Sequence, residues 1–233
     1  ELCADAAAAD SSHDFGMDVM PDLVRRAKVY AYDFSGNRIP GDPPSVLPYW
    51  RDVGTVDAYY EASMDLRAVT PALNLYNPQW PLGSTRELHP PAKFVFDQDG
   101  RRGHAVDSVV SSGCIISGGL VRGSVLGRAV RVNSGALVEN SVLFDNCDIG
   151  RNAMVRNAIL DKNVKVPEGA FIGHDHENDK SNYHVSPKGI IVVEGDRSSV
   201  EVTVLQLGGS PEKLRRRKSE NDGRNGFNGP PTD

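Results

Sequence analysis

Cysteine is scarce in this sequence, with three in 233 residues, and no two of them form a CxxC pair. The odd number and the missing pairs argue against a disulfide framework and against a zinc site. Long apolar runs are missing too, because the alanine run at residues 6–9 is short and lies among aspartates. The sequence therefore shows neither a membrane span nor a signal peptide, and we expect a soluble protein of the cytoplasm.

Positive charge is not in excess either. The formal net charge is −5, which argues against nucleic-acid binding by the body of the protein. The basic cluster KLRRRKSE lies in a polar segment that is rich in Gly, Asn and Pro. We expect residues 208–233 to form a disordered tail, with contact to nucleic acid or to an acidic partner as the alternative, and an alternating strand to precede it at residues 200–207.

The second half of the sequence contains a repeat of 17 residues. Three consecutive copies cover residues 124–140, 141–157 and 158–174, and a weaker copy that is one residue shorter covers 108–123. Four columns of inward residues coincide in the three full copies: Leu126, Leu143 and Leu160; Val130, Cys147 and Val164; Val132, Ile149 and Val166; Val138, Val155 and Ile172. Cys147, and Cys114 in the weaker copy, are therefore expected to be core thiols, whereas Cys3 lies near a terminus.

Within each copy the aliphatic positions fall six residues apart, as in Leu126, Val132 and Val138. A fixed repeat of short strands indicates a parallel solenoid, because one coil cannot bury its apolar face unless another is stacked on it. Hexapeptide spacing predicts a three-sided β-helix, which coils left-handed against the usual crossover rule. An ordinary sandwich with coincidental spacing would not align four columns over three copies.

Residues 1–75 have a different pattern. We expect a helix that begins at Pro21, a strand over residues 28–34 that ends in a Ser-Gly-Asn turn, and a second helix. Thr55 is the expected N-cap of that helix, which would continue to about Val69. Val56, Tyr59, Tyr60 and Ser63 would share one of its faces. These pieces are too few for a complete sheet and correspond to the last part of an α/β domain.

Several segments then match a known family. SHDFGMDVMP (12–21), YAYDF (30–34), YWRDVGTVDAYYEASMDL (49–66) and LHPPAKFV (88–95), together with the repeats, closely resemble bacterial glucose-1-phosphate adenylyltransferase, also called ADP-glucose pyrophosphorylase. The resemblance implies a nucleotidyltransferase that joins ATP and α-D-glucose 1-phosphate into ADP-glucose and pyrophosphate for glycogen biosynthesis. It also implies a homotetramer under allosteric control, with a Rossmann-like domain ahead of a left-handed β-helix.

We therefore predict a mixed fold. Residues 1–75 would be the C-terminal part of a Rossmann-like α/β nucleotidyltransferase domain. Residues 76–105 would form a linker that contains a short strand at 93–96 leading into the solenoid. Residues 106–207 would form a left-handed parallel β-helix of about four coils, and residues 208–233 would be the tail. The family's glycine-rich GGxGxRLxPLT loop and its EKP segment have no counterpart in these residues, and the chain starts at Glu1 rather than Met. We expect a C-terminal fragment of the enzyme that is inactive by itself.

Mg²⁺ is the cofactor that the resemblance implies. Asp52, in the WRDVGT turn, corresponds to one of the family's two metal-binding aspartates and is the candidate catalytic and metal-binding residue; capping of the turn is the alternative. A Mg²⁺ ion takes carboxylate oxygens as ligands and neutralises charge on the phosphates. Asp14 and Trp50 are the candidates for substrate binding. For Asp14 a structural role near the sugar site is favoured, and for Trp50 packing in a core is favoured.

The resemblance places small-molecule effectors where the linker meets the β-helix. The candidate allosteric residues are Lys93 in the PPAKF segment, Arg156 on the solenoid, and Lys180 and His184 just after it. Solvated surface charge is the alternative for these residues. Asn157 and His184 occupy positions that are often arginine in relatives, so the residues do not determine the identity of the effector.

The residues also suggest two alternative functions. Many hexapeptide β-helices are acyltransferases that use a histidine as general base, and His174, His176 and His184 follow the last coil. Such a base usually lies near a loop extruded from a coil, and none of the four coils contains an insertion, which counts against this alternative. The other possibility is a catalytically silent regulatory or assembly subunit, because the faces of a prism are good association surfaces.

Overall fold

The computed structural model describes residues 2–43, 46–83 and 87–195. The chain forms two compact units, the first made of Glu1–Trp50 and Tyr76–Leu82 and the second of Arg51–Leu75 and Gly83–Asp233. In the described ranges no helix has the length and apolar character that a membrane crossing requires. The strand expected at residues 200–207 and the tail at 208–233 lie outside the described residues.

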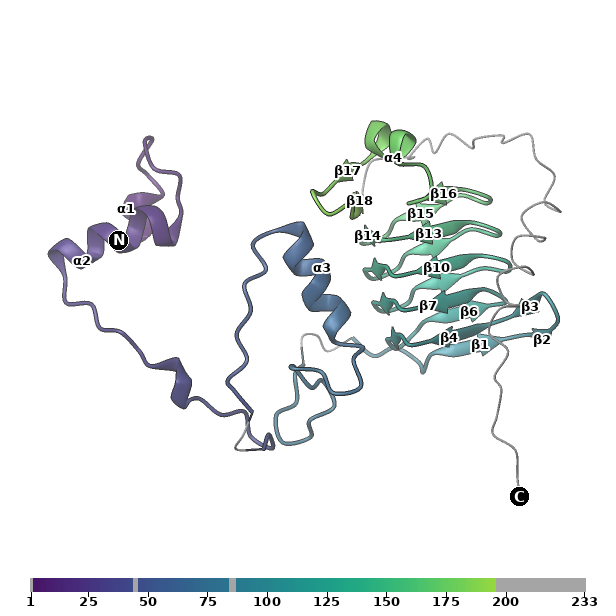
Figure 1. Cartoon of the computed structure of the whole chain (residues 1–233), viewed down its shortest axis with the longest axis horizontal. Coiled ribbons are helices and arrows are strands. Elements are labelled where there is room, and N and C mark those ends of the chain that lie inside the picture. Colours follow the sequence, from purple (N-terminus) through teal and green to yellow (C-terminus); the bar gives the residue numbers. More distant parts are fainter. Residues whose placement is uncertain (1, 44–45, 84–86, 196–233) are drawn as a thin grey trace, which may run out of the picture. The chain divides into compact units, whose positions relative to one another are not determined.

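The second unit is built on a solenoid whose three sides are parallel sheets (Figure 1). The first sheet contains β1 (Lys93–Val95), β6 (Ile115–Ser117), β9 (Arg131–Val132), β12 (Asp148–Ile149) and β15 (Lys165–Val166). The second contains β4 (His104–Val106), β7 (Leu120–Arg122), β10 (Leu137–Glu139), β13 (Met154–Arg156) and β16 (Phe171–Ile172). The third contains β5 (Val109–Val110), β8 (Val125–Leu126), β11 (Val142–Leu143), β14 (Ala158–Leu160) and β18 (Ile191–Val193).

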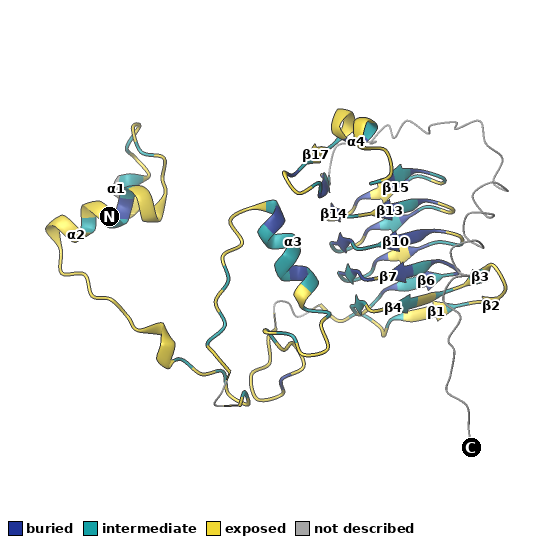
Figure 2. Ribbon diagram, in the orientation of Figure 1, coloured by how far each residue is buried: buried dark blue, intermediate teal, exposed yellow. Residues whose placement is uncertain are grey.

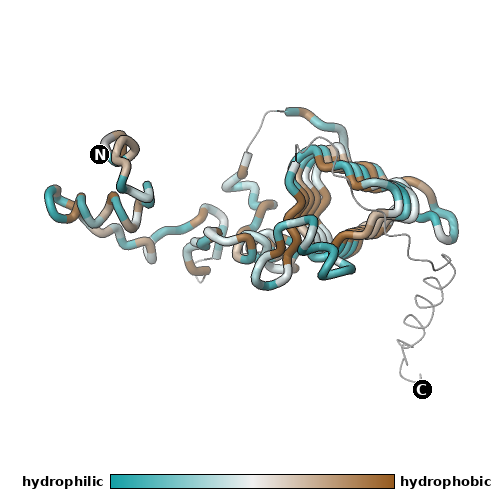
Figure 3. Tube along the Cα trace, turned by 90° about the horizontal axis from the view of Figure 1, so that it is seen from above, coloured by the Kyte–Doolittle hydropathy of each residue, from teal (hydrophilic) through white to brown (hydrophobic). Residues whose placement is uncertain are grey.

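The 17-residue repeat sets the register of these sheets. Leu126 pairs with Leu143 and Leu143 with Leu160, and every residue of the four predicted columns is buried (Figure 2). Seen from above, the coils superimpose (Figure 3). Each buried aliphatic side chain contributes about 1.5–3 kcal/mol relative to an exposed one. The left-handed parallel β-helix predicted from the repeat is confirmed, and Cys114 and Cys147 are core thiols as expected.

Asparagine recurs at the corners of the solenoid because the chain turns sharply there. Asn140 and Asn157, one coil apart, have φ of 44° and 49°, and Asn146 and Asn163 both have φ of 63°. Asparagine tolerates this left-handed conformation better than most residues do. The corners therefore repeat with the same period as the core.

Both end coils carry an insertion. In the first coil, β2 (Asp97–Gln98) and β3 (Arg101–Arg102) form an antiparallel hairpin between β1 and β4. In the last coil, α4 (His176–Asn182) and β17 (His184–Val185) come between β16 and β18, and β17 pairs antiparallel with β18. Tyr183 and Val185 of this insertion pack against the core. The four sequence copies are uninterrupted, as expected, and the insertions lie in the coil parts outside them.

The first unit contains short helices and extended segments. They are α1 (Leu2–Asp5), a π-helical turn (Phe15–Val19), α2 (Met20–Arg26) and a 3-10 turn (Phe34–Gly36). The helix predicted from Pro21 is confirmed. The strand predicted over residues 28–34 is wrong, because residues 28–33 have no regular secondary structure and pair with no neighbouring strand in the described part of the chain. Tyr30 and Tyr32 are exposed, and β-forming side chains alone do not make a strand without a partner.

Helix α3 (Val56–Asp65) belongs to the second unit. The predicted N-cap is confirmed, since the hydroxyl of Thr55 accepts a hydrogen bond of 3.1 Å from the amide of Ala58. The helix ends four residues before the expected Val69. At that end the amides of Leu66 and Arg67 bond to the carbonyls three residues before them, which tightens the last turn and stops the helix.

Candidate functional site

The WRDVGT turn leads directly into α3. One carboxylate oxygen of Asp52, Oδ1, accepts a hydrogen bond of 3.0 Å from the amide of Gly54, and the Asp52 side chain is exposed. Arg51 forms ion pairs with Asp65 and, at 3.6 Å, with Glu61. The turn is therefore fixed to the helix that it precedes, and it presents a carboxylate to solvent.

The apolar face of α3 packs on the outside of the third sheet. Buried Val142, Ile159 and Ile190 contact one set of partly buried residues from the helix and from the solenoid: Val56, Tyr59, Tyr60, Met64 and Phe144. Three of the four residues that the sequence placed on one face, Val56, Tyr59 and Tyr60, are in this cluster, and Ser63 is buried. The helix is thus held by the β-helix and not only by the chain around it.

Polar contacts also join α3 and the segment after it to the solenoid. The hydroxyl of Ser186 donates to the carboxylate of Asp57, and both residues are buried. Lys188 pairs with Glu61. The hydroxyl of Tyr60 donates to the carbonyl of Asn140 at 2.7 Å. Sequence reasoning did not identify these contacts, since residues 80 or more positions apart leave no local pattern.

The candidate effector residues fall in three places on the solenoid. Lys93 is exposed on β1 of the first sheet, and Arg156 is exposed on β13 of the second. Lys180 and His184 are exposed on the insertion of the last coil, in α4 and β17. The structure brings the last two onto one insertion, and it puts Lys93 and Arg156 on different sides of the prism.

Arg156 continues a column of charged side chains on the outer face of the second sheet. Arg122, Glu139 and Arg156 are in register on β7, β10 and β13, and Arg122 pairs with Glu139 at 3.3 Å. Burial and the charge of Arg156 lower the pKa of His174, whose ring meets that of Phe171 edge to face. His174 is therefore disfavoured in its charged form, and the column contains both signs of charge.

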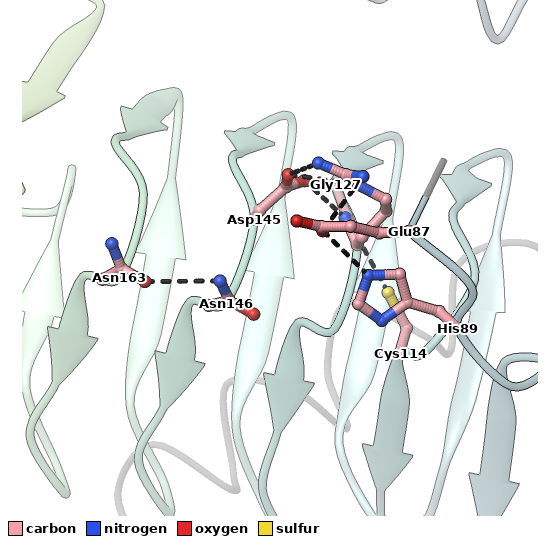
Figure 4. A network of polar contacts seen from close by, with 8 residues as sticks. Glu87, His89, Cys114, Gly127, Asp145, Asn146 and Asn163 are labelled. Carbon is pink, nitrogen blue, oxygen red and sulfur yellow. Dashed lines mark hydrogen bonds and ion pairs between the residues drawn. The ribbon is translucent and has the colours of Figure 1, made fainter. Parts of the chain in front are cut away.

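A polar network lies at one corner of the solenoid, where the linker meets it (Figure 4). Arg128 bonds to Asp145 of the next coil and approaches Glu87 at 3.4 Å, while His89 lies 3.5 Å from Glu87. In the same view the thiol of Cys114 donates to the carbonyl of Gly127 at 3.0 Å. The sequence analysis missed this network, although the 17-residue spacing of Arg128 and Asp145 is a signal that could have indicated it.

A hollow of about 290 Å³ lies beside the β2–β3 hairpin. Polar residues of the hairpin and of β4 face two leucines of the second sheet there: Gln98, Asp99, Arg102, His104, Leu120 and Leu137. No sequence pattern indicated this hollow, because it depends on how the hairpin folds back over the corner of the prism.

The two substrate-binding candidates lie in the first unit. Asp14 caps the Phe15–Val19 turn, and its Oδ1 accepts a hydrogen bond of 2.7 Å from the amide of Met17. Trp50 is 74 % exposed. The expectation that Trp50 packs in a core is wrong for the described chain, because the residues around it form no cluster that covers its ring. A structural contact is found for Asp14, and substrate binding by either residue stays a prediction.

Each of the two parts of the chain matches the model of a known protein family. Residues 1–69 match the family model described as nucleotidyl transferase, and residues 90–193 match the one described as GlmU-like, C-terminal hexapeptide. Fold and family models together define the class as a nucleotidyltransferase with a hexapeptide-repeat β-helix.

Individual relatives share one name. Glucose-1-phosphate adenylyltransferase of Koribacter versatilis is 48 % identical over 200 residues, which cover 86 % of this chain and 47 % of the relative. The protein of that name from Dechloromonas aromatica is 47 % identical over 196 residues, 84 % of this chain and 44 % of the relative. Within this class the chain is similar, over most of its own length, to proteins named glucose-1-phosphate adenylyltransferase. It spans about half the length of the curated relatives that it matches.

Proposed function

We propose that the chain takes part in the transfer of an adenylyl group from ATP to α-D-glucose 1-phosphate, which releases pyrophosphate and yields ADP-glucose for glycogen synthesis. The observation that carries this proposal is the 48 % identity over 200 residues to a protein of that name. The cytoplasm, where a soluble enzyme would meet both substrates, is the proposed location.

In this proposal Asp52 is a ligand of Mg²⁺. Its carboxylate is exposed, and among the described residues its one hydrogen-bond partner is the amide of Gly54, so an oxygen remains for a cation. A Mg²⁺ site is commonly made from one or two carboxylates together with substrate phosphates and water. In the described ranges no group of three or more His, Cys, Asp or Glu is placed to hold a metal. Asp52 would therefore act as one ligand, and the ion, when bound, would neutralise charge on the phosphates.

Other residues have supporting roles in the proposal. Asp14 would shape the sugar site through the turn that it caps, and Trp50 would offer its exposed ring to a substrate. Lys93, Arg156, Lys180 and His184 would bind small-molecule effectors in a homotetramer. An Arg156→Ala variant should then weaken activation by a sugar phosphate without changing turnover at saturation.

The test uses a chimera in which the chain is preceded by the part of the Koribacter versatilis relative that the chain does not cover. We expect it to form ADP-glucose and pyrophosphate from ATP and glucose 1-phosphate in the presence of Mg²⁺. The Asp52→Asn variant should lose at least about a hundredfold in kcat. Asp99→Asn, on the hairpin, is the control and should keep full activity.

A folded chimera that makes no ADP-glucose would contradict the proposed function. Full activity of the Asp52→Asn variant would contradict the role of Asp52 alone. Circular dichroism and gel filtration of each variant establish that it is folded before its activity is compared.

A further inference from the structure

A short turn of the last coil, Ser186–Gly189, holds α3 at two points. It is closed by the amide of Gly189, which bonds to the carbonyl of Ser186 at 2.9 Å. The hydroxyl of Ser186 accepts a hydrogen bond of 2.9 Å from the amide of Ile190 and donates its own proton to Asp57. The hydroxyl has one proton and a carboxylate can only accept, so this proton goes to Asp57 while the oxygen accepts from the backbone of the turn.

Burial makes this bond costly to lose. Ser186 is 4 % exposed and Asp57 is 9 % exposed. A buried carboxylate that loses its donor retains the desolvation penalty without compensation. The position of α3 along the sheet therefore depends on this turn as well as on apolar packing, which has no direction of its own.

The second contact between the Ser186–Gly189 turn and α3 is part of a chain of ion pairs that reaches the WRDVGT turn. Lys188 pairs with Glu61, and Glu61 also lies 3.6 Å from Arg51. Arg51 immediately precedes Asp52, the candidate metal ligand. The Ser186–Gly189 turn is thus connected to the backbone beside Asp52 by side chains that all lie in the second unit.

We propose that Ser186 and Lys188 are positioning residues for the Asp52 turn and act through Asp57 and Glu61. The proposal rests on the proposed function, because it assumes that the place of Asp52 matters for Mg²⁺. The same segment links this turn to a second region. Lys180 and His184 lie on the insertion at 176–185, which runs directly into Ser186.

A purely stabilising role is the competing explanation, and the chain offers a matched control for it. Tyr60 also bonds α3 to the solenoid, at 2.7 Å to the carbonyl of Asn140, but this bond bypasses the Ser186–Gly189 turn. Tyr60→Phe removes one hydrogen bond between the same helix and the same solenoid. Ser186→Ala leaves a buried carboxylate without its donor and should lose at least as much stability as Tyr60→Phe, but only Ser186→Ala should affect the Asp52 turn.

The first measurement is amide hydrogen exchange by NMR on the full 233-residue chain. Three amides report on the turn and its helix start: Gly54, bonded to Asp52, and Ala58 and Tyr59, both bonded to Thr55. We expect Ser186→Ala and Lys188→Gln to speed their exchange about fivefold, which is the low end of typical site-to-site coupling. Ser186→Thr, which keeps the hydroxyl, should restore the original rates. Unchanged exchange in both variants, or equal acceleration by Tyr60→Phe, overturns the proposal.

The second measurement is the Mg²⁺ dependence of the chimera described above. Ser186→Ala should raise the half-saturating Mg²⁺ concentration about fivefold, with the KM for glucose 1-phosphate unchanged. Tyr60→Phe should leave both values unchanged. An active chimera whose Mg²⁺ requirement is the same in all variants overturns the proposal. A chimera without activity contradicts the proposed function instead, and the exchange rates then decide the positioning role by themselves.

Discussion

Arg128 and Asp145 bond to one another across two neighbouring coils, at the corner where the first and third sheets meet. The backbone amide of Arg128 donates to Oδ1 of Asp145 at 2.7 Å, and its side-chain Nε donates to Oδ2 at 3.1 Å. Both residues are partly exposed. Because one carboxylate accepts from the backbone and from the guanidinium, it fixes the stacking of the two corners.

The first prediction concerns the acid stability that this carboxylate provides. Hydrogen bonds from Arg128 lower the pKa of Asp145 below its ordinary value of 3.8. A group whose folded pKa is lowered contributes stability that is present above the unfolded pKa and is lost as the pH falls through the folded one. Asp145→Asn should therefore be less stable than the original chain at neutral pH, with the difference shrinking below about pH 4. Urea unfolding across this range measures the difference.

A second prediction compares two glycines that share a left-handed backbone. Gly173 has φ of 82° and Gly169 has φ of 70°. A Cβ atom added at Gly173 would overlap the carbonyl oxygen of Arg156, whereas one at Gly169 would have nothing within 4 Å. Gly169→Ala should cost about 1–2 kcal/mol of unfolding free energy from the backbone alone, and Gly173→Ala more than about 3 kcal/mol. Equal losses in chemical denaturation would refute the close approach at Gly173.

A third prediction uses the three thiols. Cys3 is exposed, whereas Cys114 and Cys147 are buried in the solenoid. Burial raises the pKa of Cys147 to about 12 and also raises that of Cys114. Since the thiolate is the reactive form, a disulfide reagent near pH 8 should label one thiol in the folded chain and three after unfolding. Rapid labelling of Cys147 in the folded chain would mean that the core opens there.

The sequence predicted the solenoid well for a physical reason. A solenoid repeats its contacts at a fixed spacing, so that Leu126, Leu143 and Leu160 carry the same information three times. The N-cap at Thr55 was equally local, since it needs only a hydroxyl three residues before the amide that it accepts from.

Contacts without local pattern could not be predicted. The turn at Asp52 was found through the family resemblance, but its connection to Ser186 through α3 depends on tertiary packing. The strand predicted over residues 28–34 was wrong because β-propensity does not say whether a partner strand is present. Trp50 was expected in a core on composition alone, and the structure leaves it exposed. The parts of the solenoid outside the three full copies and the weaker one lacked the 17-residue spacing, so their insertions were not foreseen.

The last prediction concerns Asp179, which is 2 % exposed on the insertion of the last coil. Its Oδ2 accepts a hydrogen bond of 3.1 Å from the amide of Gly173, while Oδ1 has no partner among the described residues. Burial raises the pKa of Asp179; Asp175 raises it further, and hydrogen bonding and the charge of His174 partly oppose the rise. The folded insertion therefore holds this carboxyl group more readily in its protonated form.

The sign of the pH effect is opposite to that at Asp145. A raised folded pKa gives stability that is fully present below the unfolded pKa and is lost as the pH rises through the folded one. The Asp179→Asn variant cannot titrate here, and its amide oxygen can still accept from Gly173. The original chain should thus lose stability relative to the variant as the pH rises above about 4. Urea unfolding of both proteins over that range measures the difference. A flat difference for Asp179→Asn would show that burial does not perturb this carboxyl group.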